Sequence, residues 1–477
     1  MMKKLFMGFG VIVALLFCSC AKTAYKAVIP SDALMVAELD VKSVALKSDL
    51  KSQKDDLEEV MKRMASEDDS MVKAIKKGLE EGCIDFMSPM YLFVPNDLEE
   101  MAGFVLISIK DDDKMAEVLK ALGVELNEKD GVRWLSMEDA LFGVLSDELL
   151  LMGSEQERKP YQEMLDRKAS DSFFASESGK FMSKNAKDIT LMCDFTTIEP
   201  RDMKALVGSF AREANIPGEM LDKYCEMLCE MKAVVNLEFN KGEILLNLFS
   251  QGGDKDRFEK MFTEKISKDA LGYIDDDHLY GFLAMSIRGE EMKDELDKSL
   301  DELASMDPSE GAILDAVKDY VEQLNGTMVA AISGRNLNDP KILCLLPTAK
   351  SNTVSAINDL GAGGQFDDYL KGDGEYTAFS LDPSYKFKGA ASPTDKISEA
   401  KDCYLYAYVN IAQLLKQDFG SMLSREEKDL LGLADYAELK ISEPEHLSLS
   451  LKLTDDSDNV LEILLRKSIE LARKEAN

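Results

Sequence analysis

One pattern recurs four times along the chain and constrains its fold more than any other feature. It is an Asp, a short apolar run, and then a residue of a helix-capping type. The four segments are Asp32–Asp40, Asp188–Thr196, Asp277–Ser286 and Asp402–Asn410. The apolar runs are typical of strands, and each last residue is of a type that accepts hydrogen bonds from the first backbone N–H groups of a helix. We therefore expect four strands that each lead directly into a helix.

Each segment is followed by a helical stretch, two further strands and another helix. The alternation is cleanest in the last copy, where Ala437, Leu439 and Ile441 alternate with Glu438 and Lys440. A second alternating run, Leu447–Leu453, follows a turn. The pairs expected in the other copies are Met90–Val94 with Phe104–Ile109, Val235–Phe239 with Ile244–Leu248, and Met328–Ile332 with Ile342–Leu346. A period of two indicates a sheet with helices on one side and solvent on the other.

The repeated order β-α-β-β-α predicts an α+β fold of four degenerate ferredoxin-like (split β-α-β) modules with antiparallel sheets. Extra strands are expected near 140–152 and 376–381, and long helical insertions at 45–80, 199–232 and 289–324. The expected division is a signal peptide (1–19), a lipid-anchored linker (20–30) and modules 31–185, 186–270, 271–395 and 396–477.

The N-terminus has the pattern of a targeting signal. Lys3 and Lys4 precede the apolar run Leu5–Phe17, which is too short to span a bilayer and ends at Cys18-Ser19-Cys20. This pattern predicts a lipoprotein signal cleaved after Ser19, with lipid on Cys20 as a tether. Surface-exported lipoproteins of gut Bacteroidales usually carry acidic residues just after that cysteine. Here the first acid is Asp32, so we expect the periplasmic face of the outer membrane.

Charge and motifs exclude several classes of function. The chain has 57 Lys and Arg against 89 Asp and Glu, and a net charge of −32 disfavours nucleic-acid binding. Neither a Gly-x-Ser-x-Gly elbow nor a nucleotide P-loop is present. His278 and His446 stand at strand starts in different modules. We therefore assign no catalytic or cofactor-binding residue and expect no cofactor.

Metal and cysteine patterns have simpler structural interpretations. The acidic loops at 110–113 and 454–458 fail the spacing of a calcium loop and suit helix capping. Cys225 and Cys229, four residues apart among methionines, favour core packing over a metal site. Six cysteines follow the signal, and the sequence does not choose their pairing. Trp134 is the only tryptophan, which weakens a carbohydrate-binding interpretation. We assign no metal ligand.

A family resemblance rests on both ends of the chain. The segments Cys18–Cys20, Ile29–Leu34 and Asp40–Ser43, with Leu447–Thr454 before a polar helix, resemble the pattern of an uncharacterised Bacteroidales lipoprotein family. That family is known only as a domain of unknown function. The resemblance implies an envelope location and an architecture, and it implies no activity.

Three functions remain open at this stage. The first is a non-catalytic binding or scaffold protein of the cell envelope, tethered to the outer membrane through Cys20 and contacting a protein or envelope component. Repeated modules build extended surfaces suited to such binding. The second is a periplasmic hydrolase of glycan or peptide that uses carboxylates. The third is a carrier of a small ligand or cation, suggested by the acidic charge.

Overall fold

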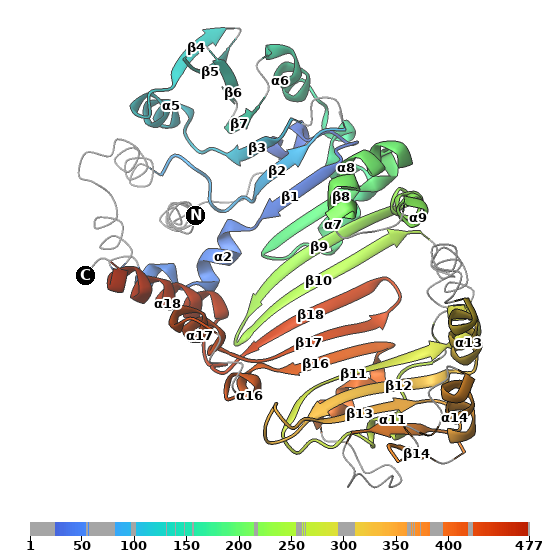
Figure 1. Ribbon diagram of the computed structural model, residues 1–477. Helices are drawn as coiled ribbons and strands as arrows, with labels where there is room; N and C mark the ends of the chain where they lie inside the picture. Colours follow the sequence, from blue (N-terminus) through green and yellow to red (C-terminus); the bar gives the residue numbers. More distant parts are fainter. Residues whose placement is uncertain are drawn as a thin grey trace. The chain divides into compact units, whose positions relative to one another are not determined.

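The chain folds into two compact units, seen in the computed structural model (Figure 1). Unit 1 is formed within residues 1–207, 228–251 and 456–477, and unit 2 within 208–227 and 252–455. The structure describes residues 24–53, 56, 82–96, 102–129, 131–138, 140–146, 148–154, 157–213, 218–253, 260, 262, 264–293, 311–359, 364, 366, 368–372, 374–381, 395–417 and 423–475.

Unit 1 is built on a sheet in which β1 is central and pairs antiparallel with both β2 and β8. The strand order is β10-β9-β8-β1-β2-β3-β7-β6-β5-β4. The strands are β1 (Met35–Leu39), β2 (Met90–Val94), β3 (Phe104–Ser108), β4 (Glu125–Lys129), β5 (Val132–Met137), β6 (Ala140–Ser146), β7 (Leu149–Gly153), β8 (Ile189–Asp194), β9 (Met231–Asn240) and β10 (Glu243–Gly252).

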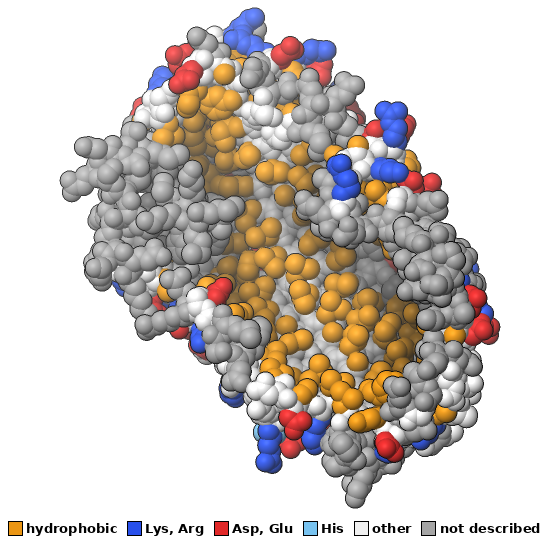
Figure 2. Space-filling model, in the orientation of Figure 1, with side chains coloured by type: hydrophobic (Ala, Val, Ile, Leu, Met, Phe, Trp, Pro, Cys, Tyr) orange, Lys and Arg blue, Asp and Glu red, His pale blue; other side chains and the backbone are white. Residues whose placement is uncertain are grey.

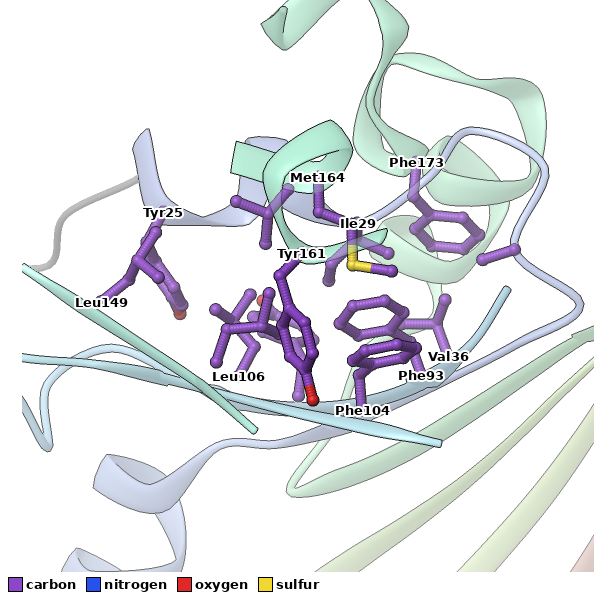
Figure 3. Packing of buried hydrophobic residues seen from close by; sticks show 14 of the residues in the cluster. Tyr25, Ile29, Val36, Phe93, Phe104, Leu106, Leu149, Tyr161, Met164 and Phe173 are labelled. Atoms are coloured by element: carbon purple, nitrogen blue, oxygen red, sulfur yellow. The ribbon is translucent and has the colours of Figure 1, made fainter. Parts of the chain in front are cut away.

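Short helices and 3-10 turns (η) cover one face of this sheet. Tyr161 and Phe173 lie in the same buried cluster as Phe93 and Phe104 of the strands (Figure 3). The rings of Phe93 and Phe104 stack at 5.4 Å, a contact worth roughly 0.5–1.5 kcal/mol beyond the burial itself. The helical elements of this part of the chain are η1 (Ala24–Val28), α2 (Val41–Lys47), α5 (Asp112–Ala121), α6 (Arg158–Leu165), η2 (Ala169–Asp171), η3 (Phe173–Ala175), α7 (Glu177–Lys184), η4 (Phe195–Thr197), the first half of α8 (Pro200–Glu213) and α18 (Val460–Glu475). The rest of α8 and nearly all of α9 (Gly218–Leu228) belong to unit 2.

Unit 2 has the same kind of sheet, with β11 central between β12 and β16. The strand order is β18-β17-β16-β11-β12-β13-β15-β14. The strands are β11 (Leu279–Arg288), β12 (Asn325–Ser333), β13 (Lys341–Leu346), β14 (Leu370–Gly372), β15 (Thr377–Ser380), β16 (Leu405–Asn410), β17 (Ala434–Glu443) and β18 (His446–Leu453).

The core of unit 2 lies between this sheet and short helices on one face. Leu271, Ile397 and Ala400 pack in one buried cluster with Phe282 and Tyr406 of the central strands. The helical elements are α11 (Lys268–Leu271), α13 (Gly311–Glu322), α14 (Lys350–Asp359), α15 (Asp395–Ser398), η6 (Glu399–Asp402), α16 (Ile411–Leu415) and α17 (Arg425–Leu431).

Two of the four expected helix caps are confirmed. Asp40 accepts a hydrogen bond from the Ser43 amide at 2.9 Å, and Asn410 accepts one from the Gln413 amide at 2.9 Å. In the second copy the cap is Asp194, whose side chain accepts from the backbone N–H of Thr196, so Thr196 was the wrong residue. Ser286 is not a cap either, because β11 continues past it and buries it inside the strand.

The α+β class and the antiparallel pairing are confirmed, as are the expected strand pairs and the extra strands β7 and β15. The hairpin of β4 and β5 was not predicted. Helices α8 and α9 lie within the expected helical insertion at 199–232, whose last two residues begin β9. In the insertion at 289–324, residues 289–293 and α13 are helical, as expected. Most of the insertion at 45–80 lies outside the described residues. The division into four ferredoxin-like modules stays a prediction.

Candidate apolar binding faces

The hairpin of β17 and β18 turns its aliphatic residues away from the helices. Glu438 and Ser450 lie directly opposite each other and are buried, at 3% and 5% exposure. The next pair, Leu439 and Leu449, points to the other face, where Leu449 is 41% exposed. The expected division into a helix-covered face and an open face is therefore confirmed. In this hairpin, however, the polar residues are under the helices and the aliphatic residues are in the open.

The open aliphatic surface continues across six neighbouring strands of unit 2, and we call it the unit 2 face. Ile332 and Val409 are each 43% exposed on it (Figure 2 shows hydrophobic side chains gathered over these strands). Cross-strand register arranges it in three rows: Ile342, Ile332, Gly281, Val409, Ala437 and Leu451; Cys344, Ala330, Leu283, Ala407, Leu439 and Leu449; and Met328, Met285, Leu405, Ile441 and Leu447.

A polar network lies beneath the unit 2 face, on the helix side of the sheet. The hydroxyl of Tyr406 donates to Glu438 Oε1 at 2.6 Å, and Lys440 Nζ pairs with Glu438 Oε2 at 2.8 Å. Lys440 also reaches Glu399 Oε2 of η6 at 2.9 Å. The Glu438 carboxylate thus has a partner on each oxygen, which compensates for its loss of water.

The pKa shifts in this network agree with its geometry. Burial is the main reason that the pKa of Tyr406 is raised, and the neighbouring Glu438 carboxylate raises it further. Burial alone would lower the pKa of Lys440, but its hydrogen bonds to Glu438 and Glu399 outweigh burial and raise it. The raised pKa values keep the Tyr406 phenol neutral and the Lys440 ammonium charged at neutral pH. The network therefore fixes the sheet to η6 rather than offering a reactive group.

Unit 1 repeats the arrangement, and we call its open surface the unit 1 face. Leu92 and Ile189 are 42% and 38% exposed on it. Its rows are Ala233, Cys193, Met35 and Val94; Val235, Leu191, Ala37, Leu92, Val105 and Met152; and Leu237, Ile189, Leu39 and Met90.

Beneath the unit 1 face, buried polar residues again lie on the helix side. Thr190 and Asn236 face each other there across β8 and β9. Asn247 of β10 donates to Asn236 Oδ1 at 3.0 Å, and Asn236 donates to the carbonyl of Asn185 at 2.6 Å. In each unit the hydrogen-bonding side chains are therefore used inside the fold.

Two helices limit how much of the unit 1 face is open. Around α5, Met115 and Leu119 join a buried cluster with Leu150, and Met152 packs partly against it. Val41 of α2 packs near Leu39 and Met90 at the other end. The open part therefore centres on β1, β2, β8 and β9.

Both faces can offer a ligand apolar contacts but no polar side chain. Their rows carry Ala, Val, Leu, Ile, Met, Cys and Gly, so they offer no charge, amide or hydroxyl to a ligand. The backbone groups of the central strands are occupied in the ladders. The unit 2 face measures roughly 24 Å across the strands and 14 Å along them, on the order of 350–600 Å² with its margins. This is the size of the largest apolar patch on a typical monomer, and such a patch is often functional.

Several residues singled out by sequence do not enter these faces. Ser19 and Cys20 lie outside the described residues, so the lipid anchor stays a prediction. Among the helices that the structure describes, none is both long and apolar enough to cross a membrane. Trp134 is buried in the unit 1 core near Tyr161 and is no open platform for a sugar.

The two histidines stand at the starts of strands that are not neighbours, since β16 and β17 separate β11 from β18. His278 precedes β11 with a φ of 55° and lies 3.6 Å from Asp277. His446 opens β18, and burial lowers its pKa. The structure does not bring them into one site.

The acidic loop before α5 works as a cap, because Asp111 accepts a hydrogen bond from the Lys114 amide at 3.1 Å. Within the described ranges, no group of three His, Cys, Asp or Glu side chains could hold a metal ion. Cys225 is buried, as core packing requires. Cys193 and Cys344 are thiols that lie in the unit 1 and unit 2 faces, a placement that only strand register could reveal.

One depression of the surface contains two carboxylates, the type of residue that the hydrolase interpretation requires. A depression of about 480 Å³ in unit 1 is lined by Asp56, Glu470, Arg466 and Arg473, with Ser52, Gln53 and Ile469. Arg473 pairs with Asp56 at 2.6 Å. This pair ties α18 to the residues after α2 and gives no specific support to hydrolysis.

Comparisons with known proteins give one family and a weak structural likeness. Two crystal forms of TP0453, described as "Structure of crystal form IV" and "Structure of crystal form III", are similar at 12% identity with TM-scores of 0.29 and 0.27. The matches cover 48% and 52% of this chain and 81% and 89% of those chains. No curated protein matches. The family described as domain of unknown function (DUF4836) matches residues 25–359, and the chain belongs to that family.

Proposed function

We propose that this chain is a non-catalytic binding protein of the cell envelope whose two open sheet faces are its binding surfaces. The observation that carries the proposal is the orientation of the sheets. Aliphatic side chains of the cross-strand rows are partly exposed, up to 43% at Ile332 and Val409, while Glu438 and Asn236 are buried beneath the rows. A large exposed apolar patch above buried polar side chains is the less common arrangement in a folded chain, and such patches are often interaction sites.

The energetic argument supports a partner. Covering apolar surface is worth roughly 25 cal/mol per Å², so the unit 2 face holds on the order of 10 kcal/mol of burial that the isolated chain does not use. Association costs a comparable amount in lost freedom of motion, so the net affinity is moderate. Such a surface suits a reversible carrier or adaptor.

The location is part of the proposal. The basic start, the short apolar run and Cys18-Ser19-Cys20 support lipid attachment at Cys20, and the absence of acids before Asp32 supports the periplasmic side of the outer membrane. A tether keeps a binding face in the compartment where its partner is found.

The four-module interpretation supports two equivalent faces. Strands β10-β9-β8-β1-β2-β3-β7 and β18-β17-β16-β11-β12-β13-β15 follow the same order in the two units. We propose that both arose from one paired β-α-β-β-α architecture, so that each unit presents one face.

An environment-sensitive apolar dye, such as anilinonaphthalene sulfonate, tests this function on the mature chain. A double variant of the unit 2 face, Leu283→Gln with Leu449→Gln, should bind about half as much dye as the unchanged chain. A double variant of the unit 1 face, Leu92→Gln with Ile189→Gln, should lose the other half of the bound dye. Met137→Gln is the matched control, since Met137 is 45% exposed on β5 and lies outside the rows. Equal dye binding by all variants would refute the proposed function.

A further inference from the structure

We infer that the occupant of the unit 2 face is a basic amphipathic helix of a partner protein, about 16 residues long. The inference rests on the proposed function and names its partner. The length follows from the face, because six strands span roughly 24 Å and an α-helix rises 1.5 Å per residue.

An amphipathic occupant suits an open face better than pure hydrocarbon does. Leu283, Ile332 and Leu449 are about 40% exposed, so the face covers an occupant from one side only. An acyl chain lying there would leave its outer side in water. A helix with an apolar stripe buries that stripe and keeps its polar side solvated.

Other protein occupants fit less well. An added β-strand needs a free sheet edge, and the rows lie in mid-sheet, where β11, β16 and β17 already pair on both sides. A stable globular interface buries about 800 Å² per partner. The unit 2 face is on the order of 350–600 Å². That area is small for a second copy of this chain and matches one side of a helix.

Charge complementarity predicts that the polar side of the bound helix is positively charged. The chain carries a net charge of −32 with a sequence pI near 4.5. Exposed acids follow or precede the strands at both ends of the rows: Asp276, Asp277, Asp339, Glu290, Glu443 and Glu445. The exposed cations at these ends are fewer, with Arg335 and Lys341 among them. A helix whose polar side carries Lys or Arg is therefore attracted, and an acidic helix is repelled.

The third row suits helices of differing sequence. Met285 and Met328 face each other across β11 and β12. Methionine side chains are flexible and polarisable, and they adapt to differently shaped apolar partners. We therefore expect recognition of a charge and apolar pattern rather than one sequence.

The test uses two synthetic 16-residue peptides with the same Leu stripe, one with Lys and one with Glu at every polar position. Fluorescence anisotropy measures their binding to the mature chain, and circular dichroism measures helix formation. We expect the Lys peptide to bind as a helix and more weakly at higher salt, and the Glu peptide to bind at least tenfold more weakly. Leu283→Gln with Leu449→Gln should weaken the Lys peptide about 25-fold, at roughly fivefold for each half-exposed leucine. Met137→Gln should change nothing.

Three outcomes would overturn the inference. Equal binding of both peptides removes the charge argument. Binding of neither peptide, while a fatty acid or neutral phosphatidylcholine vesicles bind and the Leu→Gln pair abolishes it, assigns the face to lipid and leaves the proposed function standing. Concentration-dependent dimers lost in the same variant assign the face to a second copy. If the dye too is unaffected by the variants, the proposed function itself fails.

Discussion

Replacing Glu438 by Ala should destabilise unit 2 strongly, although its neighbours on β17, Ala437 and Leu439, point to the open face. Its carboxylate is buried and accepts hydrogen bonds from Tyr406 at 2.6 Å and Lys440 at 2.8 Å. Breaking a buried ion pair from one side costs about 3–5 kcal/mol. Lys440 is 27% exposed and keeps Glu399 at 2.9 Å, so we expect a loss of about 2–4 kcal/mol.

Urea unfolding of the mature chain, followed by far-ultraviolet circular dichroism, measures this loss. Glu443→Ala is the control, because Glu443 is exposed on the same strand and its removal should cost less than about 0.5 kcal/mol. The fluorescence of Trp134 reports unit 1 separately, since that residue is buried there. A loss below about 1 kcal/mol for Glu438→Ala would refute the reasoning that the polar side of β17 is the structural side.

Three further predictions follow from the same structure. First, Leu283→Gln should change the free energy of unfolding by less than about 0.5 kcal/mol in the same urea experiment. Phe282→Ala should cost about 3–5 kcal/mol, because Phe282 is buried and stacks on Tyr406. Equal costs for the two variants would contradict the assignment of the faces. Second, burial raises the pKa of the Cys193 thiol to about 11. At pH 8 its alkylation rate in the folded chain should therefore be about 100-fold lower than in the urea-unfolded chain, and this rate should increase with pH until about pH 11. Equal alkylation rates in the folded and unfolded chains would count against this prediction. Third, Cys20→Ala should move the protein from the membrane to the soluble periplasmic fraction and abolish palmitate labelling; retention at the membrane would remove the proposed anchor.

Strand positions could be predicted from the sequence because apolar alternation is a local signal. The runs at Met90–Val94 and Leu447–Leu453 coincide with β2 and β18. The hairpin of β4 and β5 escaped prediction because Glu125–Lys129 shows no such alternation. Its pairing comes from β5, whose Trp134 is buried in the unit 1 core opposite Asn127.

The open apolar faces could not be predicted, because alternation separates the two faces of a sheet without saying which one the helices cover. For β17 that choice depends on its neighbour in the sheet. Tyr406 and Tyr408 of β16 are buried under α11, α15 and η6, and register places Tyr408 beside Glu438. The tyrosines of the segment Asp402–Asn410 were the sequence signal for which face of β17 is buried. Using that signal requires knowing that β16 pairs with β17.

Native thiols give the most direct test of the central claim, because Cys193 and Cys344 lie in the open faces of units 1 and 2. Each thiol is alkylated in the folded chain with and without saturating apolar dye, and the extent is measured for each peptide by mass spectrometry. We expect the dye to slow alkylation of both thiols severalfold and to leave Cys229, which lies outside the rows, unchanged. Unchanged alkylation of Cys193 and Cys344 with the dye bound would contradict the assignment of these faces as binding surfaces.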